Sequence, residues 1–196
     1  MALLRVPFVK TAGCRIGALV LAASAVAPPS GAVAAGDARA NEYQVKAAIL
    51  YNLAKFVEWP ADAFANATQP LAICVVGLDP FGALLDDALR GHLVSGRAAT
   101  VKRLDDVKAD CHVLFVAASE RRRLAAIIDQ IGQASVLTVS DAEGFTDVGG
   151  IIGLSVDGER VRFDINTAGA ERARLRLSAR LMALASAVRR PREPAR

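Results

Sequence analysis

The segment Leu71–Gly82 constrains the fold of this chain more than any other stretch. Leu71–Val76 is a continuous apolar run with several β-branched residues, a pattern typical of a strand buried on both faces of a parallel sheet. After a turn at Gly77, Asp79 and Pro80 predict the start of a helix, because Asp caps helix N-termini and Pro needs no amide donor there. A strand, a tight turn and a capped helix open a βαβ unit.

Apolar periodicity and turn signals predict the remaining elements. Helices are expected at 43–57, 80–90, 120–131 and 168–188, and further strands at 95–104, 113–116 and 136–139. Ser119 is the expected cap of the third helix, and Asn166 or Thr167 that of the last. Asp157 and Gly158, between runs at 151–155 and 160–165, predict a hairpin. The predicted fold class is therefore α/β: a Rossmann-like three-layer fold with a mostly parallel sheet, extended by a C-terminal antiparallel hairpin and packed by N- and C-terminal helices.

The first 35 residues have the features of an export signal. Three basic residues precede an apolar stretch, Ile16–Ala27, and small residues near 34–35 provide a cleavage site. The stretch has 12 residues, whereas a membrane-spanning helix needs about 20, so a cleaved signal peptide is favoured over a retained anchor. The predicted organisation is a signal at 1–35, a domain at 41–188 and a disordered basic tail at 189–196.

Removal of the signal changes the charge balance. The chain carries 24 basic and 20 acidic residues, and three of the basic ones lie within 1–35. The exported part keeps 21 basic against 20 acidic residues and is nearly neutral. The basic isoelectric point of the whole chain is therefore no argument for nucleic-acid binding, and no nucleic-acid partner is expected.

Two cysteines, Cys74 and Cys111, remain after the signal is removed. Cys74 lies in the first buried strand and Cys111 begins another, so adjacent strands would bring them close together. In an oxidising compartment such a pair can form a disulfide. Two buried free thiols acting as small apolar residues are the alternative.

Signatures of catalysis and cofactor binding are weak. Gly77 and Gly82 give the spacing of a phosphate-binding loop, but Ala83 and Leu84 replace the required Lys and Ser or Thr. His112 follows Cys111 without further ligands nearby, whereas a metal site needs three or four, so a structural histidine is favoured. We expect no cofactor, no metal and no catalytic residue, and hence no enzyme.

Two features are candidates for partner or ligand binding. Glu58 and Trp59 place the only tryptophan beside a charge at a helix end; tryptophan is a frequent binding anchor, although a position at the edge of the core is the simpler interpretation. Arg172, Arg176 and Arg180 recur every four residues and predict one basic stripe on the last helix. Such a stripe is usually solvated, but it could also bind an acidic partner or a small anion.

Several segments, in order and spacing, resemble YfiR-like periplasmic proteins. They begin with Tyr43–Ala48 and Lys55–Pro60, and continue with the segments at 73–82, 111–116, 136–141, 149–152 and 161–166. Each segment alone is weakly specific, but together they cover the predicted domain.

The resemblance implies an exported, non-enzymatic regulator. Such a protein would bind the periplasmic domain of an inner-membrane diguanylate cyclase and repress it, so that its release raises cyclic-di-GMP and favours biofilm growth. The resemblance further implies a homodimer, a disulfide between Cys74 and Cys111, and sequestration by an outer-membrane lipoprotein. A second cysteine pair found in some members is missing here, because no cysteine follows Cys111.

The residues leave a second function open. A periplasmic small-molecule sensor of another membrane signalling system would use a pocket at the carboxyl edge of the sheet, near Asp79 and Ser140.

Overall fold

Within the described residues, 31–107 and 110–189, the computed structural model is built around an eight-stranded sheet. The strands follow one another across the sheet as β10 (Ala187–Arg189), β8 (Arg160–Asn166), β7 (Ile152–Asp157), β6 (Leu137–Ser140), β5 (Val113–Val116), β2 (Leu71–Val76), β4 (Arg97–Leu104) and β3 (Leu93–Val94). All four strands expected before the hairpin are therefore present.

The middle of the sheet is parallel, from β7 through β6, β5 and β2 to β4. β8 returns antiparallel to β7, with Asp157 opposite Arg160 at the turn, which confirms the hairpin. At the two edges, β10 runs parallel to β8 and β3 antiparallel to β4. The mostly parallel sheet with an antiparallel extension confirms the predicted fold class.

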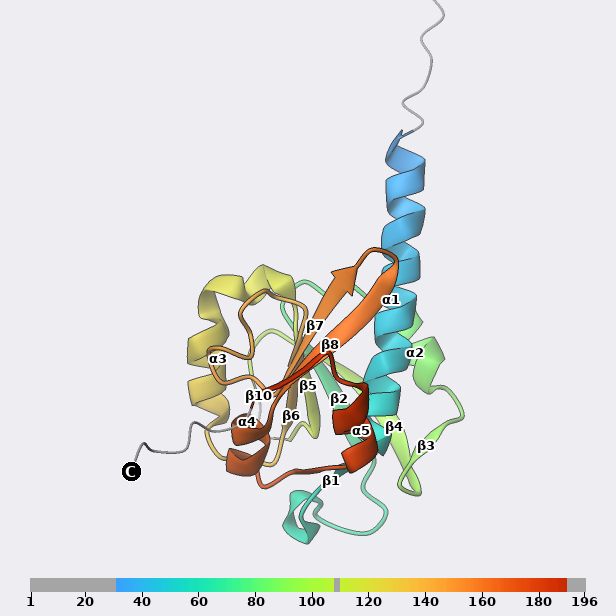
Figure 1. Ribbon diagram of the computed structural model, residues 1–196. Coiled ribbons are helices and arrows are strands. Elements are labelled where there is room, and N and C mark those ends of the chain that lie inside the picture. Colours follow the sequence, from blue (N-terminus) through green and yellow to red (C-terminus); the bar gives the residue numbers. More distant parts are fainter. Residues whose placement is uncertain (1–30, 108–109, 190–196) are drawn as a thin grey trace, which may run out of the picture.

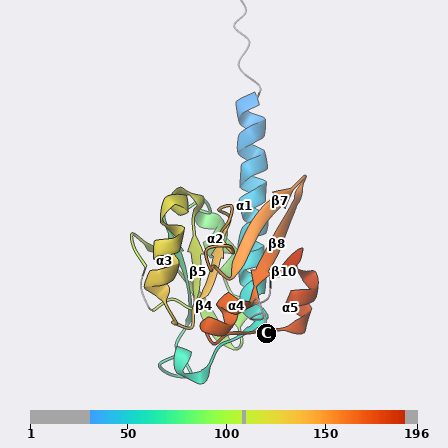
Figure 2. The same ribbon diagram turned by 60° about the vertical axis from the view of Figure 1, so that its left-hand side comes forward.

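Helices form a layer on each face of the sheet (Figures 1 and 2). The helices and 3-10 turns are α1 (Gly31–Lys55), η1 (Ala61–Ala63), α2 (Ala83–Leu89), η2 (Ala118–Arg123), α3 (Leu124–Ile131), α4 (Thr167–Arg172) and α5 (Ala179–Leu184). α1 and α2 lie on one face and α3 on the other. A separate two-stranded ribbon joins β1 (Val57–Glu58) to β9 (Arg176–Leu177).

β2 shows why the sheet needs both layers. All six of its residues are buried. Ile73 and Val75 belong to the core beneath α1 and α2, whereas Cys74 and Val76 belong to the core beneath α3. Burial of a large aliphatic side chain stabilises the fold by about 1.5–3 kcal/mol, so a strand that is apolar at every position is stable only between two helical layers.

α1 is longer at its start and shorter at its end than the helix predicted at 43–57. It begins at Gly31, and its first turns extend beyond the sheet (Figure 1, blue). Residues from Tyr43 onward pack into the core, whereas 36–41 are exposed. The proposed signal peptide lies mostly in 1–30, outside the described residues, and its remainder falls in α1. No helix of the described part is long and apolar enough to cross a membrane.

Two predicted helix starts are wrong. α2 begins at Ala83 after Gly82, not at Pro80; Asp79 instead accepts a hydrogen bond from the amide of Phe81 at 2.8 Å and shapes the turn. The helix expected from 120 starts as η2, and α3 begins at Leu124. Ser119 does not cap it, because its hydroxyl accepts a hydrogen bond from the amide of Leu78 at 2.9 Å.

The helix predicted at 168–188 is also wrong. Asn166 does cap α4, accepting a hydrogen bond from the amide of Gly169 at 3.2 Å, but α4 ends at Arg172. Arg174 then takes a left-handed conformation with φ 56°, which interrupts the helix. The chain continues through β9, α5 and β10, so the expected C-terminal helical layer is two short helices. Of the expected disordered tail at 189–196, Arg189 is ordered in β10 and the rest lies outside the described residues.

Candidate functional site

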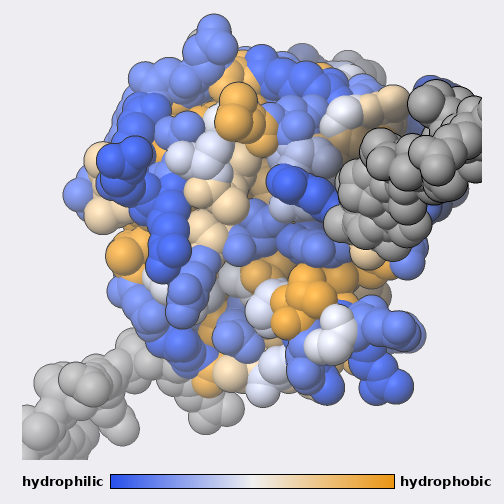
Figure 3. All heavy atoms as spheres, turned by 90° about the horizontal axis from the view of Figure 1, so that it is seen from above, coloured by the Kyte–Doolittle hydropathy of each residue, from blue (hydrophilic) through white to orange (hydrophobic). Residues whose placement is uncertain are grey.

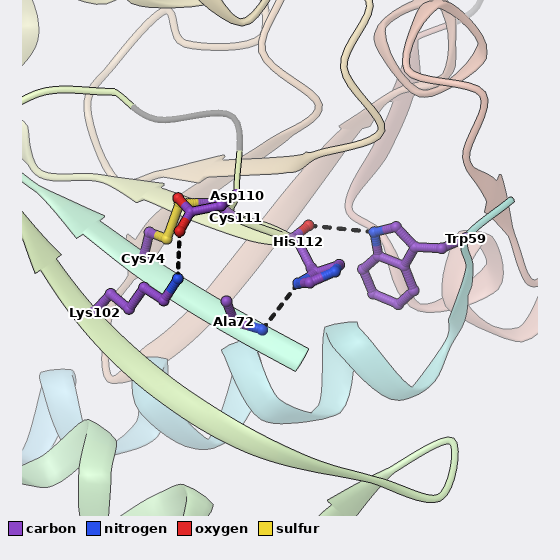
Figure 4. Close-up of a disulfide and its surroundings, with 7 residues drawn as sticks. All are labelled: Trp59, Ala72, Cys74, Lys102, Asp110, Cys111 and His112. Atoms are coloured by element: carbon purple, nitrogen blue, oxygen red, sulfur yellow. Dashed lines mark hydrogen bonds and ion pairs between the residues drawn. A yellow bond between two sulfur atoms is a disulfide. The ribbon is translucent and has the colours of Figure 1, made fainter. Parts of the chain in front are cut away.

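Cys74 and Cys111 form a disulfide, with their Cα atoms 5.9 Å apart. β2 and β5 are neighbouring parallel strands, and Cys111 lies two residues before β5, beside Cys74 (Figure 4). Both residues are buried, at 0% and 4% exposure. The pairing that the sequence left open is therefore confirmed, and the bond ties together two neighbouring inner strands of the sheet.

His112 is the buried structural residue that the sequence favoured. Its Nδ1 accepts a hydrogen bond from the Ala72 amide at 3.0 Å, so the proton lies on Nε2, which donates to the carbonyl of Ala63 at 3.1 Å. Its ring stacks on Phe64 with centroids 4.2 Å apart. Burial lowers the pKa of His112, because the charged form would lose its hydration.

Trp59 is held beside this histidine at the edge of the core. Its indole N–H donates to the carbonyl of His112 at 3.3 Å (Figure 4), and its ring meets Phe64 edge-on, with centroids 6.4 Å apart. The loop after β1 is thereby fixed to the start of β5. This is the core-edge position that the sequence favoured, but the ring remains half-buried rather than fully enclosed.

A cleft of about 390 Å³ opens beside Trp59. Its lining residues come from β1, the following loop, the start of β2, and the end of β3 with the turn into β4: Val57, Glu58, Trp59, Pro60, Ala61, Phe64, Leu71, Val94, Ser95 and Arg97. Because Leu71 and Arg97 begin parallel strands, the cleft lies at the amino edge of the sheet. The cleft combines an aromatic and aliphatic wall with one acidic and one basic residue.

Arg97 supplies the basic group of this cleft, which sequence analysis missed. Its guanidinium lies over the ring of Phe64, 3.9 Å from the centroid, and its Nη1 donates to the carbonyls of Asn66 and Gln69 at 2.9 and 2.8 Å. Stacking and hydrogen bonds together fix the position of the charge. Arg97 and Trp59 are far apart in sequence, so spacing carried no signal of their proximity.

The arginines predicted as one stripe do not share a helix. Arg176 lies in β9 opposite Glu58, with 3.8 Å between Nε and a carboxylate oxygen. Arg180 lies in α5, 5.7 Å above the ring of Phe56. Arg172, at the end of α4, instead donates to the carbonyl of Gly149 at 3.0 Å. The structure thus brings Glu58, Arg176 and Arg180 to the Trp59 end of the molecule and leaves Arg172 apart.

A second polar cluster, which the sequence analysis also missed, joins α1 to the carboxyl edge of the sheet, where β6 ends. Nζ of Lys46 and the hydroxyl of Tyr43 both donate to Oδ2 of Asp141 at 2.7 Å, and Lys46 also pairs with Glu42. The side chains of Lys46 and Asp141 are only 3% and 5% exposed. Oδ1 of Asp141 is buried without a partner among the described residues.

The electrostatics of this cluster favour a charged Lys46. Burial acts to lower the pKa of Lys46, but its hydrogen bonds to Asp141 and Glu42 outweigh burial and leave the pKa raised. Burial also raises the pKa of Tyr43, and its hydrogen bond to Asp141 adds to the shift. Tyr43 therefore remains a neutral donor, and Lys46 and Asp141 form a buried ion pair that attaches α1 to the end of β6.

The residues near which a carboxyl-edge pocket was hypothesised have bonding roles of their own. Asp79 accepts a hydrogen bond from Nε of Arg103 at 2.6 Å, and Arg103 also pairs with Asp86 at 2.6 Å. This contact lowers the pKa of Asp86. Ser140 is buried and donates to the carbonyl of Val116 at 2.7 Å. Among the described residues, no group of three or more His, Cys, Asp or Glu side chains could hold a metal ion.

The fold and the cleft define a class: an α/β protein of three-layer architecture with a disulfide between two inner strands of its sheet and a partly aromatic cleft at the amino edge. The YfiR/HmsC-like family model (DUF4154) matches residues 43–186. The chain therefore belongs to the YfiR/HmsC-like family, as the resemblance implied.

A solved structure is also similar: the crystal structure of a conserved domain protein from Vibrio cholerae. It shares 13% sequence identity at a TM-score of 0.48, and the alignment covers 60% of this chain. The chain matches 54% of the length of that protein.

Proposed function

We propose that this protein is a periplasmic regulatory binding protein that represses an inner-membrane diguanylate cyclase by binding the cyclase's periplasmic sensor domain. Repression would lower cyclic-di-GMP and restrain biofilm formation. The observation that carries the proposal is family membership across residues 43–186, which is nearly the whole described domain. Under this proposal the protein acts by binding and catalyses no reaction.

Repression requires differential affinity for two states of the receptor. A regulator that bound active and inactive cyclase equally would not shift the equilibrium between the two states, however tightly it bound. A tenfold preference for the inactive state corresponds to about 1.4 kcal/mol. In this proposal Glu58, Trp59, Arg176 and Arg180 are contact candidates, since they lie at one end of the molecule. Arg172 remains a separate candidate.

The proposal includes export with cleavage near residues 34–35, a homodimer, and sequestration by an outer-membrane lipoprotein as a means of release. Export is consistent with the disulfide between Cys74 and Cys111, because disulfides persist in oxidising compartments.

The test is the cyclic-di-GMP concentration in a strain lacking the gene. We expect deletion to raise it, and complementation with the exported chain to restore the low level. A complementing copy without residues 1–35 is the matched control, because it stays in the cytoplasm and should fail to restore repression. An unchanged cyclic-di-GMP level after deletion would refute the proposal.

The cleft beside Trp59 supports a second candidate, a small-molecule sensor of another membrane signalling system. Its volume of about 390 Å³ lies in the range of ligand sites, roughly 300–1,000 Å³. A thermal-shift screen with periplasmic metabolites tests this function: a ligand should stabilise the wild type but not Trp59→Ala. The absence of any stabilising compound would count against it.

A further inference from the structure

The two edges of the main sheet are closed to different extents. At one edge, β10 pairs with three of the seven residues of β8, so within the described residues only the four at 160–163 have no flanking strand on that side. At the other edge, beside α2 (Figure 1), β4 has eight residues, and β3 pairs only with the first two, Arg97 and Ala98. Across the described part of the chain, no strand flanks Ala99–Leu104 on that side. Natural sheets usually shorten or cover such an edge, because its unpaired backbone groups can pair with another chain.

The register shows which backbone groups are unpaired. Val94 and Arg97 face each other across the two-residue turn at Ser95 and Gly96, so the N–H and C=O of Arg97 point toward β3. Every second residue points the same way. The backbone groups of Ala99, Val101 and Arg103 therefore lie along the open edge, while those between them face β2. At about 3.3 Å per residue, the segment 99–104 provides roughly 20 Å of open edge.

A hollow of about 510 Å³ lies beside this edge. Its apolar lining combines the end of α2 with β3 and β4 through Leu89, Leu93, Ala99 and Val101. Leu93 is 58% exposed, so its side chain is accessible at the rim of the hollow. A strand added to β4 would place alternate side chains over this hollow, as in recognition by strand addition.

The charges on β4 favour an acidic segment as its partner. The strand carries Arg97, Lys102 and Arg103 and no acidic residue. Antiparallel pairing of two β4 edges offers no opposite charge to these residues, and in registers centred on Lys102 or Arg103 it places like charges opposite one another, which is destabilising. Lys102 and Arg103 pair with aspartates within the chain, yet remain 39% and 42% exposed. A carboxylate on an added strand can therefore reach them.

We propose that the open edge of β4 binds an extended segment of a partner protein by strand addition. The segment pairs its backbone with Ala99, Val101 and Arg103, places small or apolar side chains over the hollow, and presents a carboxylate to Lys102 or Arg103. The inference rests on the proposed function only in requiring a protein partner. It differs from the Trp59 cleft, which lies at the amino edge of the sheet.

The test uses a phage-displayed library of random dodecapeptides selected on the folded wild-type chain. Ala99→Pro removes an edge-facing N–H, a place where proline is tolerated in an edge strand, and Ala99→Val is the matched control that keeps the N–H. Selected peptides should alternate apolar residues and contain Asp or Glu. They should bind Ala99→Pro about tenfold more weakly than wild type or Ala99→Val, because at least one backbone hydrogen bond is lost. Amide exchange should slow at Ala99, Val101 and Arg103 when a peptide binds.

Three results would overturn the proposal. The selected peptides could bind the proline and valine variants with equal affinity, or slow amide exchange at another surface. The selection could also yield no peptide that distinguishes the two variants. A wild-type dimer that dissociates in Ala99→Pro would assign the edge to a second copy and also overturn it. Circular dichroism checks the fold of each variant. If Ala99→Pro does not fold, Leu93→Asp takes its place, since Leu93 is exposed; it should weaken binding similarly, and unchanged binding refutes the role of the edge.

The same variants separate this inference from the proposed function. Failure of gene deletion to raise cyclic-di-GMP refutes the regulator but leaves the peptide result intact. Full repression by a folded Ala99→Pro protein would show that the edge is not the receptor-binding site, but it would leave the proposed regulatory function unaffected.

Discussion

The buried ion pair between Lys46 and Asp141 allows a quantitative test of how α1 is held to the sheet. Replacing Lys46 with Met keeps much of the side-chain volume but leaves the Asp141 carboxylate, 5% exposed, without its cation. Removing one partner of a buried pair costs about 3–5 kcal/mol, a large part of the roughly 5–15 kcal/mol that stabilises a domain. With a urea m-value of about 1–3 kcal/mol/M, the unfolding midpoint should fall by roughly 1–5 M.

Urea denaturation followed by circular dichroism measures this change. Lys55→Met is the matched control, because Lys55 is exposed on the same helix and its loss should change stability by no more than about 0.5 kcal/mol. The double variant Lys46→Met with Asp141→Leu should recover much of the loss, since no buried charge is left unpaired. A cost below about 1 kcal/mol for Lys46→Met would refute the reasoning.

Further predictions follow from the disulfide, the buried histidine and a tightly packed glycine. Reducing the bond between Cys74 and Cys111, separated by 37 positions, should destabilise the protein by about 4 kcal/mol in the chain-entropy model; equal urea midpoints with and without reductant would contradict this. The lowered pKa of His112 means that the unfolded chain binds its proton more readily, so stability should fall as pH drops below about 6.5; His112→Gln should reduce the difference between urea midpoints at pH 5 and 7. Gly150→Ala should cost about 1–3 kcal/mol, because a Cβ there would clash with the buried ring of Phe145; an unchanged melting temperature would be the contrary result.

The elements that sequence analysis identified correctly are those with local signals. Leu71–Val76 and Val113–Val116 are apolar at every position, and only a strand between two layers buries such a run. The hairpin was predictable because Asp157 followed by Gly158 favours a tight turn between two strands. The prediction of one C-terminal helix at 168–188 was wrong for two reasons. Arg174 takes φ 56°, although no Gly or Pro at that point indicates a break. Leu177 pairs with Val57, a residue far away in the sequence.

The candidate site was predictable only in part for the same reason. Trp59 was identified because it is the single tryptophan beside a charge. Phe64 and Arg97, which complete the cleft, come from other segments and carry no local signature. The pair of Lys46 and Asp141 is 95 positions apart; a lysine within an otherwise apolar helix face was its one available sign. Non-local pairing, rather than composition, decides which charges meet.

Under the proposed function, the protein holds a membrane diguanylate cyclase inactive from the periplasmic side. The most direct measurement is the rate of cyclic-di-GMP synthesis by the cyclase recovered through periplasmic cross-linking, reconstituted in vesicles with its sensor domain accessible. Adding the purified chain should lower that rate in a saturable manner, and the heat-unfolded chain should have no effect. A rate that stays constant at concentrations where binding is saturated would refute repression by this protein.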